Sequence, residues 1–183
     1  NIEKNIVITN DLVIEKTQEN IVRYDKNGDQ HYDIISAFIK SIRGSDPNAA
    51  IYWLARMIEG GESPKFIARR LLILASEDIG NANPTALVMA NNCFQAVNVI
   101  GYPECRIILS QTTIYLACSE KSNSSYMAIN KAQEEVKKSK NLEVPLHLRS
   151  ASTKLAKELG YGKEYIYSHE NTEKHQEFLP KEH

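Results

Sequence analysis

Apolar side chains recur at spacings of three and four residues through the middle of the chain, which places them on one face of an α-helix. The clearest stretch lies between residues 43 and 84. There Asp46 precedes Pro47, an N-cap side chain followed by a residue that needs no N–H at the first helical position. Gly60 follows the last apolar position, and glycine readily adopts the left-handed conformation found just past a helix end. The pattern therefore predicts a helix from Pro47 to Gly60.

A second helix follows at once, because Ser63 and Pro64 repeat the start signal and Gly80 repeats the stop signal. This helix runs to Ile79 and is apolar on nearly all sides, so we expect it to lie in the middle of the domain. The side chains that these two helices are expected to bury are Ala50, Ile51, Leu54, Ile58, Phe66, Ile67, Leu71, Leu72, Leu74 and Ala75.

Further helices are predicted on both sides of this pair, over 31–42, from Pro84 to Gly101, and from Pro103 onward. Each consists of one helix and a short turn, and short connections favour antiparallel neighbours. The predicted fold is therefore all-α, an array of packed antiparallel helical hairpins. The side chains expected to be buried in the last two helices are Leu87, Val88, Ala90, Phe94, Val97, Ile100, Ile107, Ile108, Ile114, Tyr115 and Leu116.

The two ends of the chain are less clearly patterned. Residues 1–25 are too short to bury themselves, and the turn-rich residues 24–29 predict a boundary, so the predicted division is 1–25, 26–160 and 161–183. A helix is predicted over 125–138, an extended stretch over 142–148, and a short helix that Ser150 caps and that ends at Leu159. Residues 161–183 form an aromatic and then polar tail that we expect to be partly disordered.

Composition narrows the class of protein. The chain has 183 residues, enough for one domain, and its formal net charge is -1. A domain whose main task is to grip DNA phosphates is usually basic, so strong non-specific DNA binding is not expected. No apolar run approaches the roughly 20 residues that a membrane span needs.

Cellular setting is suggested by the cysteines and by the first residue. Cys93, Cys105 and Cys118 are odd in number and lie in apolar helical surroundings, which predicts reduced thiols in or near the core of a cytoplasmic protein. The chain begins with Asn1 instead of methionine, so we expect it to be part of a longer protein.

Catalytic motifs are scarce. The sequence has no glycine-rich phosphate loop that ends in Lys-Ser or Lys-Thr, so it cannot hold a nucleotide in that way. None of its five histidines has metal-ligand spacing with a carboxylate or thiol beside it, and no metal site is predicted. The tyrosines at 161, 165 and 167 could stack on single-stranded bases or cover an edge of the core.

Charged and aromatic residues of the central helices have two interpretations. Glu77 and Asp78 could act as an acid pair, but Arg69 and Arg70 lie on a helix with little polar surface, and a buried guanidinium needs a partner. The favoured hypothesis is an ion-pair network of these residues, within the array or across a subunit contact. Of the adjacent Tyr52 and Trp53, one must point away from the apolar stripe, toward a contact or the edge of the domain.

These residues also carry a family likeness. The stretch HYDIISAFIKSIRGSDPNAAIYWLARMIEGGESPKFIARRLLILASEDIGNANP resembles the region after the ATPase module in the replication-associated recombination protein A family, also called MgsA, which includes the eukaryotic Werner-helicase-interacting protein. The likeness continues through IGYPECRI, IYLACSEKSNSSYMAI, VPLHLRSASTKLAKELGYGKEYIYSHE and FLP, and covers about residues 21–180. Ser63 stands where an acidic residue is common, and Ser152 where proline is common.

The resemblance implies a clamp-loader-related AAA+ ATPase that acts at stalled or damaged replication forks and binds DNA ends or junctions and single-strand-binding protein. It implies that the Walker motifs and the arginine finger, with ATP and Mg²⁺, lie upstream of Asn1, and that residues 1–25 are the end of the helical lid. Residues 26–160 would resemble a clamp-loader collar, which in this family is associated with homotetramers. A cytoplasmic, nucleoid-associated location follows from the same likeness.

The function predicted for this part of the chain is that of a non-catalytic oligomerisation domain with no cofactor of its own. One alternative is a docking module, in which a groove between helices captures DNA or an acidic peptide such as the tail of single-strand-binding protein. Another is a small catalyst built around Glu77 and Asp78. The residues expected to make subunit or partner contacts are Arg43, Asp46, Trp53, Arg56, Arg69, Arg70, Glu77 and Asp78.

Overall fold

The structure is a computed structural model, and it describes residues 29–139, 141–171 and 173–180. Within these residues every regular element is helical and no strand occurs, which confirms the all-α prediction. The chain divides into two compact units, Asn1–Ala128 and Ile129–His183, and each is described by itself. The predicted N-terminal segment 1–25 lies outside the described residues, so the predicted domain division stays a prediction.

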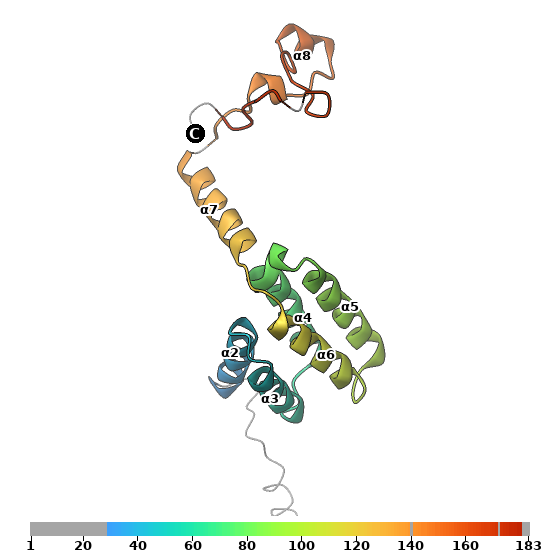
Figure 1. Ribbon diagram of the computed structural model, residues 1–183. Helices are drawn as coiled ribbons and strands as arrows, with labels where there is room; N and C mark the ends of the chain where they lie inside the picture. The colour runs from blue at the N-terminus through green and yellow to red at the C-terminus, as the bar shows by residue number, and fades with distance from the viewer. Residues whose placement is uncertain (1–28, 140, 172, 181–183) are drawn as a thin grey trace, which may run out of the picture. The chain divides into compact units, whose positions relative to one another are not determined.

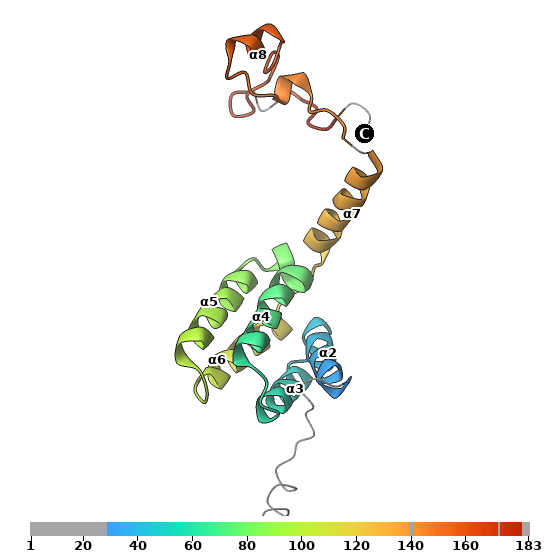
Figure 2. The same ribbon diagram turned by 180° about the vertical axis from the view of Figure 1, so that it is seen from behind.

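The first unit is built from helices joined by short turns. In both Figure 1 and Figure 2, α4 lies beside α5, and the packing contacts pair α2 with α3, α4 with α5, and α5 with α6. None of the described helices has the length and apolarity that a bilayer crossing requires. The elements are α2 (Asp29–Arg43), α3 (Pro47–Glu59), α4 (Pro64–Leu74), a π-helical turn (Ala75–Ile79), a 3₁₀ turn (Gly80–Ala82), α5 (Thr85–Ile100) and α6 (Cys105–Cys118).

The predicted start signals of the central helices are confirmed. The Asp46 side chain caps α3 by accepting a hydrogen bond from the main-chain N–H of Ala49 at 2.9 Å. The Ser63 hydroxyl caps α4 by accepting one from Phe66 at 3.4 Å. The helical winding continues as a π-helical turn to Ile79, where the sequence predicts the end of the helix.

The centre of the first unit is α6, not α4 as the sequence analysis expects. Helix α6 packs against α2, α3, α4 and α5, whereas α4 packs mainly against α5, α6 and the π-helical turn. The side of α4 that faces away from these neighbours exposes Arg69 and Ile73. Helix α4 is therefore not the central helix, although its composition is apolar on nearly all sides. Some of its aliphatic residues, such as Leu71, are buried, whereas others, such as Ile73, are exposed. The buried residues of α6 are Cys105, Leu109, Thr112, Thr113, Leu116 and Ala117.

In helix α5 the buried residues also differ in part from the predicted ones. Its buried residues are Ala86, Ala90, Cys93 and Val97, which recur at spacings of four, three and four. Small side chains in this stripe let the neighbouring helices pack closely, so the larger side chains at 87, 88 and 100 lie outside and are exposed. On α6, Ile107 and Ile114 are likewise exposed, by 63% and 44%. For these five positions the predicted burial is wrong.

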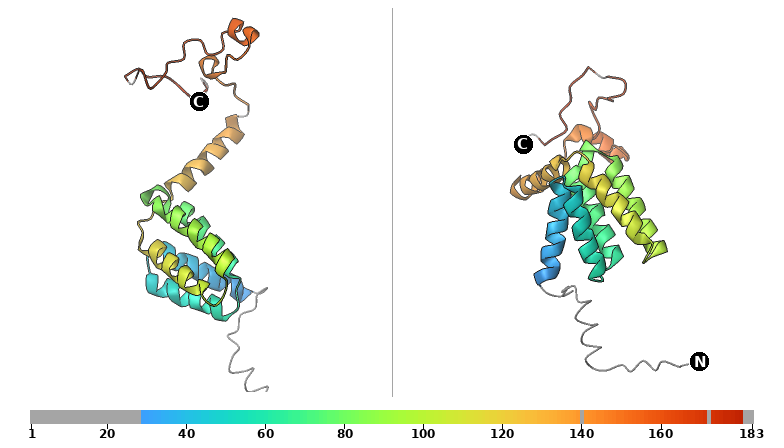
Figure 3. Two further views of the ribbon diagram at one scale, coloured as in Figure 1. Left: turned by 90° about the vertical axis from the view of Figure 1, so that its right-hand side faces the viewer. Right: turned by 60° about the horizontal axis from the view of Figure 1, so that its bottom comes forward.

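The second unit has little regular structure. Helix α7 (Ser124–Ser139), the orange helix in Figure 3, begins one residue before its predicted start. Its residues extend past Ala128, the last residue of the first unit. A 3₁₀ turn follows at Leu146–Leu148, inside the stretch expected to be extended. The short helix α8 (Lys154–Glu158) is capped by Thr153, not by Ser150, because the Thr153 hydroxyl accepts from the N–H of Ala156 at 3.1 Å. Among the described residues 129–180, no side chain is fully buried.

Candidate functional site

A cluster of charges joins the end of α2 to the π-helical turn. The Nε of Arg43 donates to Asp78 Oδ1 at 2.6 Å, and its Nη2 donates to Oδ2 at 3.2 Å. Glu77 Oε1 lies farther away, 3.8 Å from Arg43 Nη2. Asp78 is buried while Arg43 is half-exposed, and the hydrogen bond from Arg43 to Asp78 raises the pKa of Arg43. The arrangement clamps two elements that are far apart in the sequence.

The loop after α6 also contacts the end of α2 and the π-helical turn. The Nζ of Lys121 donates to the main-chain oxygens of Ala117 at 2.9 Å and Ser119 at 2.5 Å, and to the Ser45 hydroxyl at 3.0 Å. Burial lowers the pKa of Lys121. The main-chain N–H of Ser122 donates to the main-chain oxygen of Asp78 at 2.8 Å. The cluster therefore ties α2, the π-helical turn and the end of α6 together.

The ion pairs differ from the predicted ones. Within the part of the chain that the structure describes, Glu77 and Asp78 pair with Arg43, and neither Arg69 nor Arg70 lies within 4.0 Å of a carboxylate oxygen. Arg69 instead places its guanidinium over the ring of Phe66, 5.4 Å from the centroid. An intramolecular network of these arginines with the two acids is thus wrong, because the partner comes from α2. A network across a subunit contact stays a prediction.

The remaining predicted contact residues lie on α3. Trp53 packs partly against the core while Tyr52 is exposed, which confirms that one of the two aromatic residues points outward. The Arg56 guanidinium lies 5.9 Å from the centre of the Trp53 ring, within the range of a cation–π contact. Asp46 is occupied by its capping role at the start of the same helix. Whether these side chains touch another subunit stays a prediction.

The chemistry of the charged cluster favours a structural role. Both oxygens of Asp78 accept hydrogen bonds from Arg43, so this buried carboxylate is held by a cation in a fixed orientation between two helical elements. Among residues 29–139, 141–171 and 173–180, no three His, Cys, Asp or Glu side chains gather as a metal site requires. The geometry around Glu77 and Asp78 therefore supplies cohesion between helices.

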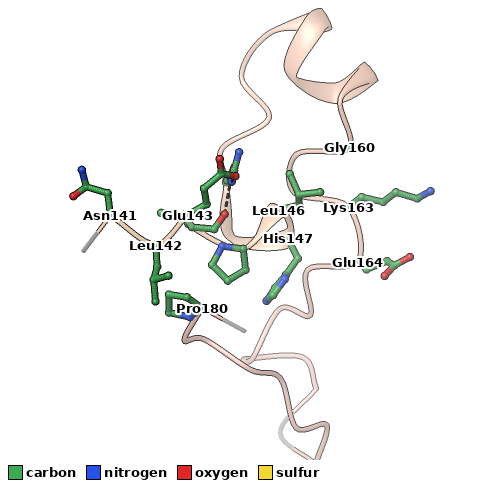
Figure 4. A pocket seen from close by; sticks show the side chains of 12 residues that line it. Asn141, Leu142, Glu143, Leu146, His147, Gly160, Lys163, Glu164 and Pro180 are labelled. Atoms are coloured by element: carbon green, nitrogen blue, oxygen red, sulfur yellow. Dashed lines mark hydrogen bonds and ion pairs between the residues drawn. The ribbon is translucent and has the colours of Figure 1, made fainter. Parts of the chain in front are cut away.

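A hollow of ≈ 790 Å³ opens inside the second unit (Figure 4). In this view the Leu142 side chain points toward Pro180, and the Lys163 side chain extends away from both. His147 lines the hollow, but its Nε2 already lies 2.9 Å from the main-chain oxygen of Glu177. The lining is a mixture of aliphatic and charged side chains from three stretches of chain, without a convergent catalytic set among the described residues.

The outer sides of α5 and α6 carry almost no charge, a feature that the sequence analysis missed. Helix α5 contains no charged residue over its 16 positions, and α6 contains only Arg106. Exposed, uncharged residues of these two helices include Leu87, Val88, Asn91, Ile107, Gln111, Ile114 and Cys118. The sequence already contained the signal for this feature, because residues 85–100 include no charged side chain. The expectation that large aliphatic residues lie inside concealed it, and Cys118 is exposed where a thiol in or near the core was predicted.

Comparison with known proteins gives the family. A family model described as the MgsA AAA+ ATPase C terminal matches residues 44–183, and one described as the AAA C-terminal domain matches residues 1–43. The replication-associated recombination protein A of Coxiella burnetii is 46% identical over 167 residues, 91% of this chain and 38% of that protein. The protein of the same name from Bacillus subtilis is 46% identical over 177 residues, 96% of this chain and 42% of that protein.

A eukaryotic relative shows the same likeness. The ATPase WRNIP1 of Dictyostelium discoideum is 44% identical over 168 residues, 92% of this chain and 19% of that protein. The chain thus spans less than half the length of each of these three relatives. Because the first family model covers most of the chain, the chain belongs to the MgsA family, as the C-terminal region of a replication-associated recombination AAA+ ATPase.

Proposed function

We propose that this region is a non-catalytic oligomerisation domain, which gathers the ATPase modules of a clamp-loader-like protein that acts at stalled replication forks. The observation that carries the proposal is the scarcity of charge on the exposed sides of α5 and α6, where Arg106 is the one charged residue of the two helices, on a helical array whose charged residues Arg43, Asp78 and Lys121 serve internal cohesion. Uncharged, partly aliphatic surfaces are typical of the central part of protein–protein contacts.

The proposal has a physical rationale in the chemistry of AAA+ proteins. An AAA+ site needs a residue from a neighbouring subunit, and a domain that holds subunits together raises the effective concentration of that neighbour. In this proposal, ATP and Mg²⁺ bind in an ATPase module outside the 183 residues, DNA is contacted through the whole protein, and the assembly is a homotetramer in the bacterial nucleoid. The relatives' names, which refer to replication-associated recombination, support the setting.

Light scattering across a dilution series tests the proposal directly. If the domain carries the assembly, the chain of 20.7 kDa should have a solution mass that is a multiple of this value and that persists on dilution. A mass equal to one chain at every concentration would overturn it. The measurement needs no nucleotide, since the proposed role is independent of ATP.

A docking function is the second candidate, and one observation favours it. The Nε atoms of Arg56 and Arg70 are shielded from solvent and have no hydrogen-bond partner among the described residues. Both side chains are partly exposed as a whole, so an acidic peptide, such as the tail of single-strand-binding protein, or DNA would pair with their terminal guanidinium nitrogens. Fluorescence anisotropy with a labelled acidic peptide should then show binding that weakens with salt and is lost in Arg70→Ala. Binding that Arg70→Ala leaves unchanged would contradict this candidate.

A further inference from the structure

Helix α2 lies at the boundary between the two family models. The model described as the AAA C-terminal domain ends at residue 43, and the model described as the MgsA C terminal begins at residue 44. In the structure, however, α2 packs against α3 and α6. Its residues Phe38 and Ile42 belong to the same core as those helices, and each is exposed by 1% or less. The last helix of the first family region is therefore an integral part of the helical array of the second.

A buried pair holds the start of α2 to the turn between α3 and α4. The Nδ1 of His31 lies 2.9 Å from Oε2 of Glu62, and the two side chains are exposed by only 13% and 9%. Glu62 Oε1 accepts a hydrogen bond from the main-chain N–H of Ser63 at 2.7 Å. The main-chain oxygen of Glu62 accepts one from the Tyr102 hydroxyl at 3.2 Å. Glu62 therefore connects the start of α2 with the start of α4 and with the turn before α6.

The end of α2 is held at a matching position. Arg43 donates two hydrogen bonds to Asp78 in the π-helical turn, and the ring of His31 lies 5.7 Å from the ring of Phe66 at the start of α4. His31 and Arg43 are as many residues apart as Phe66 and Asp78. Helix α2 therefore runs parallel to α4 and its π-helical continuation, and it is tied to this segment near both ends.

The π-helical turn that receives Arg43 is connected onward to the start of α7. The turn covers Ala75–Ile79, and π-helical turns within helices often occur at functional sites. The main-chain oxygen of Asp78 accepts a hydrogen bond from the N–H of Ser122 at 2.8 Å. The Asn81 amide donates to the hydroxyl of Ser125, the second residue of α7, at 3.4 Å. A shift of the π-helical turn would therefore reach the loop after α6 and the start of α7.

We propose that α2 is a rigid coupling helix, which passes displacements of a preceding ATPase module to the turn at Glu62 and to the π-helical turn. A helix that is packed into a core along its length and tied near both ends has no room for a hinge of its own, since packed cores do not deform continuously. From Asp78 the displacement reaches Ser122 and the start of α7. The proposal rests on the proposed function only in that an ATPase module precedes this region, and it adds a regulatory route that does not require assembly.

Hydrogen exchange in the full-length ATPase that contains this region tests the route. Exchange of residues 60–63 and 119–125 is compared with and without a saturating non-hydrolysable ATP analogue. The rates in the two conditions should differ by a factor of about five or more, as is usual for coupled sites. Asp78→Asn weakens the link to Arg43, so this factor should fall by about two-fold or more at 119–125. It should persist at 60–63, where the link through His31 is intact.

The matched control is Lys40→Gln, which removes one charge from an exposed position of the same helix and should leave both factors unchanged. Equal effects of Lys40→Gln and Asp78→Asn at 119–125 would overturn the route through Asp78. Rates that the nucleotide analogue leaves unchanged at both stretches in the wild type would overturn the coupling as a whole. The oligomerisation function is judged separately, by the solution mass, so a monomer with nucleotide-dependent exchange would overturn that function and leave the coupling standing.

A second measurement needs neither nucleotide nor a variant, and it holds even if Asp78→Asn does not fold. In native-state hydrogen exchange of the 183-residue chain, amides at 34–42 should be as protected as those of α6, because a rigid coupling helix opens only when the array unfolds. Exchange at 34–42 that is faster than in α6 by a factor of about ten or more, relative to the intrinsic rates, would show that α2 detaches on its own. That result would overturn the proposal.

Discussion

At the scale of single residues, Asp78 carries the charged cluster, because both of its oxygens hold Arg43 and its main-chain oxygen holds Ser122. Asp78→Ala should lower the free energy of unfolding by about 1–2 kcal/mol, measured by urea denaturation. The loss should stay below the roughly 3–5 kcal/mol of a fully buried pair, since Arg43 is half-exposed and regains water when its partner is removed.

The adjacent acid provides the control for this change. Glu77 lies 3.8 Å from Arg43 and is partly exposed, so Glu77→Ala should change the free energy of unfolding by less than about 0.5 kcal/mol. Equal losses in the two variants would show that the short Arg43–Asp78 hydrogen bonds are not what stabilises the joint between α2 and the π-helical turn.

Tyr102 gives the domain a dependence on alkaline pH. Its hydroxyl donates to the main-chain oxygen of Glu62 at 3.2 Å, and burial, assisted by the nearby Cys105 and Glu62, raises the pKa of Tyr102 to about 12. The folded state therefore holds this proton more tightly than the unfolded state, whose tyrosine pKa is about 10. The contribution of Tyr102 to stability is complete below about pH 10 and is lost as the pH rises toward about 12.

Urea midpoints at about pH 9 and about pH 11 check this dependence. Tyr102→Phe lacks the titrating group, so it should lose less stability than the wild type between the two values. Tyr52→Phe, which removes a hydroxyl from an exposed tyrosine on α3, should lose as much as the wild type. If Tyr102→Phe and the wild type fall in parallel, the Tyr102 hydroxyl does not titrate against folding.

At the scale of residues, the sequence predicted contacts between residues close in the chain but not contacts between residues far apart in the chain. The caps at Asp46 and Ser63 depend on the next three residues, so the sequence contains all the necessary information. Arg43 and Asp78 are 35 positions apart, and no local pattern connects them. Continuous α-helical spacing would place Glu77, seven residues after Arg70, on the same side, but the wider π-helical turn that begins at Ala75 changes the rotation of the residues that follow.

At the scale of elements, two glycines end helices with backbone angles that other residues rarely adopt. Gly80 has φ +51° and ψ −132°, and Gly101 has φ +71° and ψ −176°. A Cβ at Gly80 would lie 3.2 Å from the main-chain oxygen of Ser122, whereas a Cβ at Gly101 would meet nothing within 4 Å. Gly101→Ala should therefore cost only the backbone strain, about 1–3 kcal/mol, and Gly80→Ala should cost more.

Thermal unfolding of the two alanine variants measures the difference between these costs. Because both positions share the positive φ, the larger loss at Gly80 isolates the contact with the loop after α6. A loss at Gly101 that equals or exceeds the loss at Gly80 would show that this loop moves aside freely, and would weaken the view that Asp78 and Ser122 fix it.

The same scale shows what helix patterns can and cannot predict. The bounds of α3 and α5 and the start of α4 follow from caps, prolines and glycines, which act locally. The buried side of α5 could not be predicted from side-chain size, because Ala86, Ala90 and Cys93 are buried by the close approach of neighbouring helices. The central position of α6 likewise depends on how four other helices are arranged around it.

At the scale of the whole molecule, burial is unevenly distributed between the two units. Phe38, Ile42, Leu71, Leu109 and Leu116 form part of one core in the first unit, each exposed by 1% or less. In the second unit, as far as it is described, apolar side chains such as Leu155 are exposed and none is fully buried. The composition of the chain did not indicate this difference, and the proposed function likewise depends on the family resemblance, not on composition.

This difference predicts how the free energy of local opening varies along the chain, since protected amides require burial and cooperative packing. In native-state hydrogen exchange followed by mass spectrometry, amides of α4 and α6 should exchange only through global unfolding, at about 5–15 kcal/mol. Amides of α8 and of the 3₁₀ turn at Leu146–Leu148 should open at about 0–2 kcal/mol. Protection of α8 equal to that of α6 in dilute protein would contradict the uneven burial. Protection of α8 that appears only as the concentration rises would instead show that a second copy covers the second unit, so a dilution series decides which surface each unit uses.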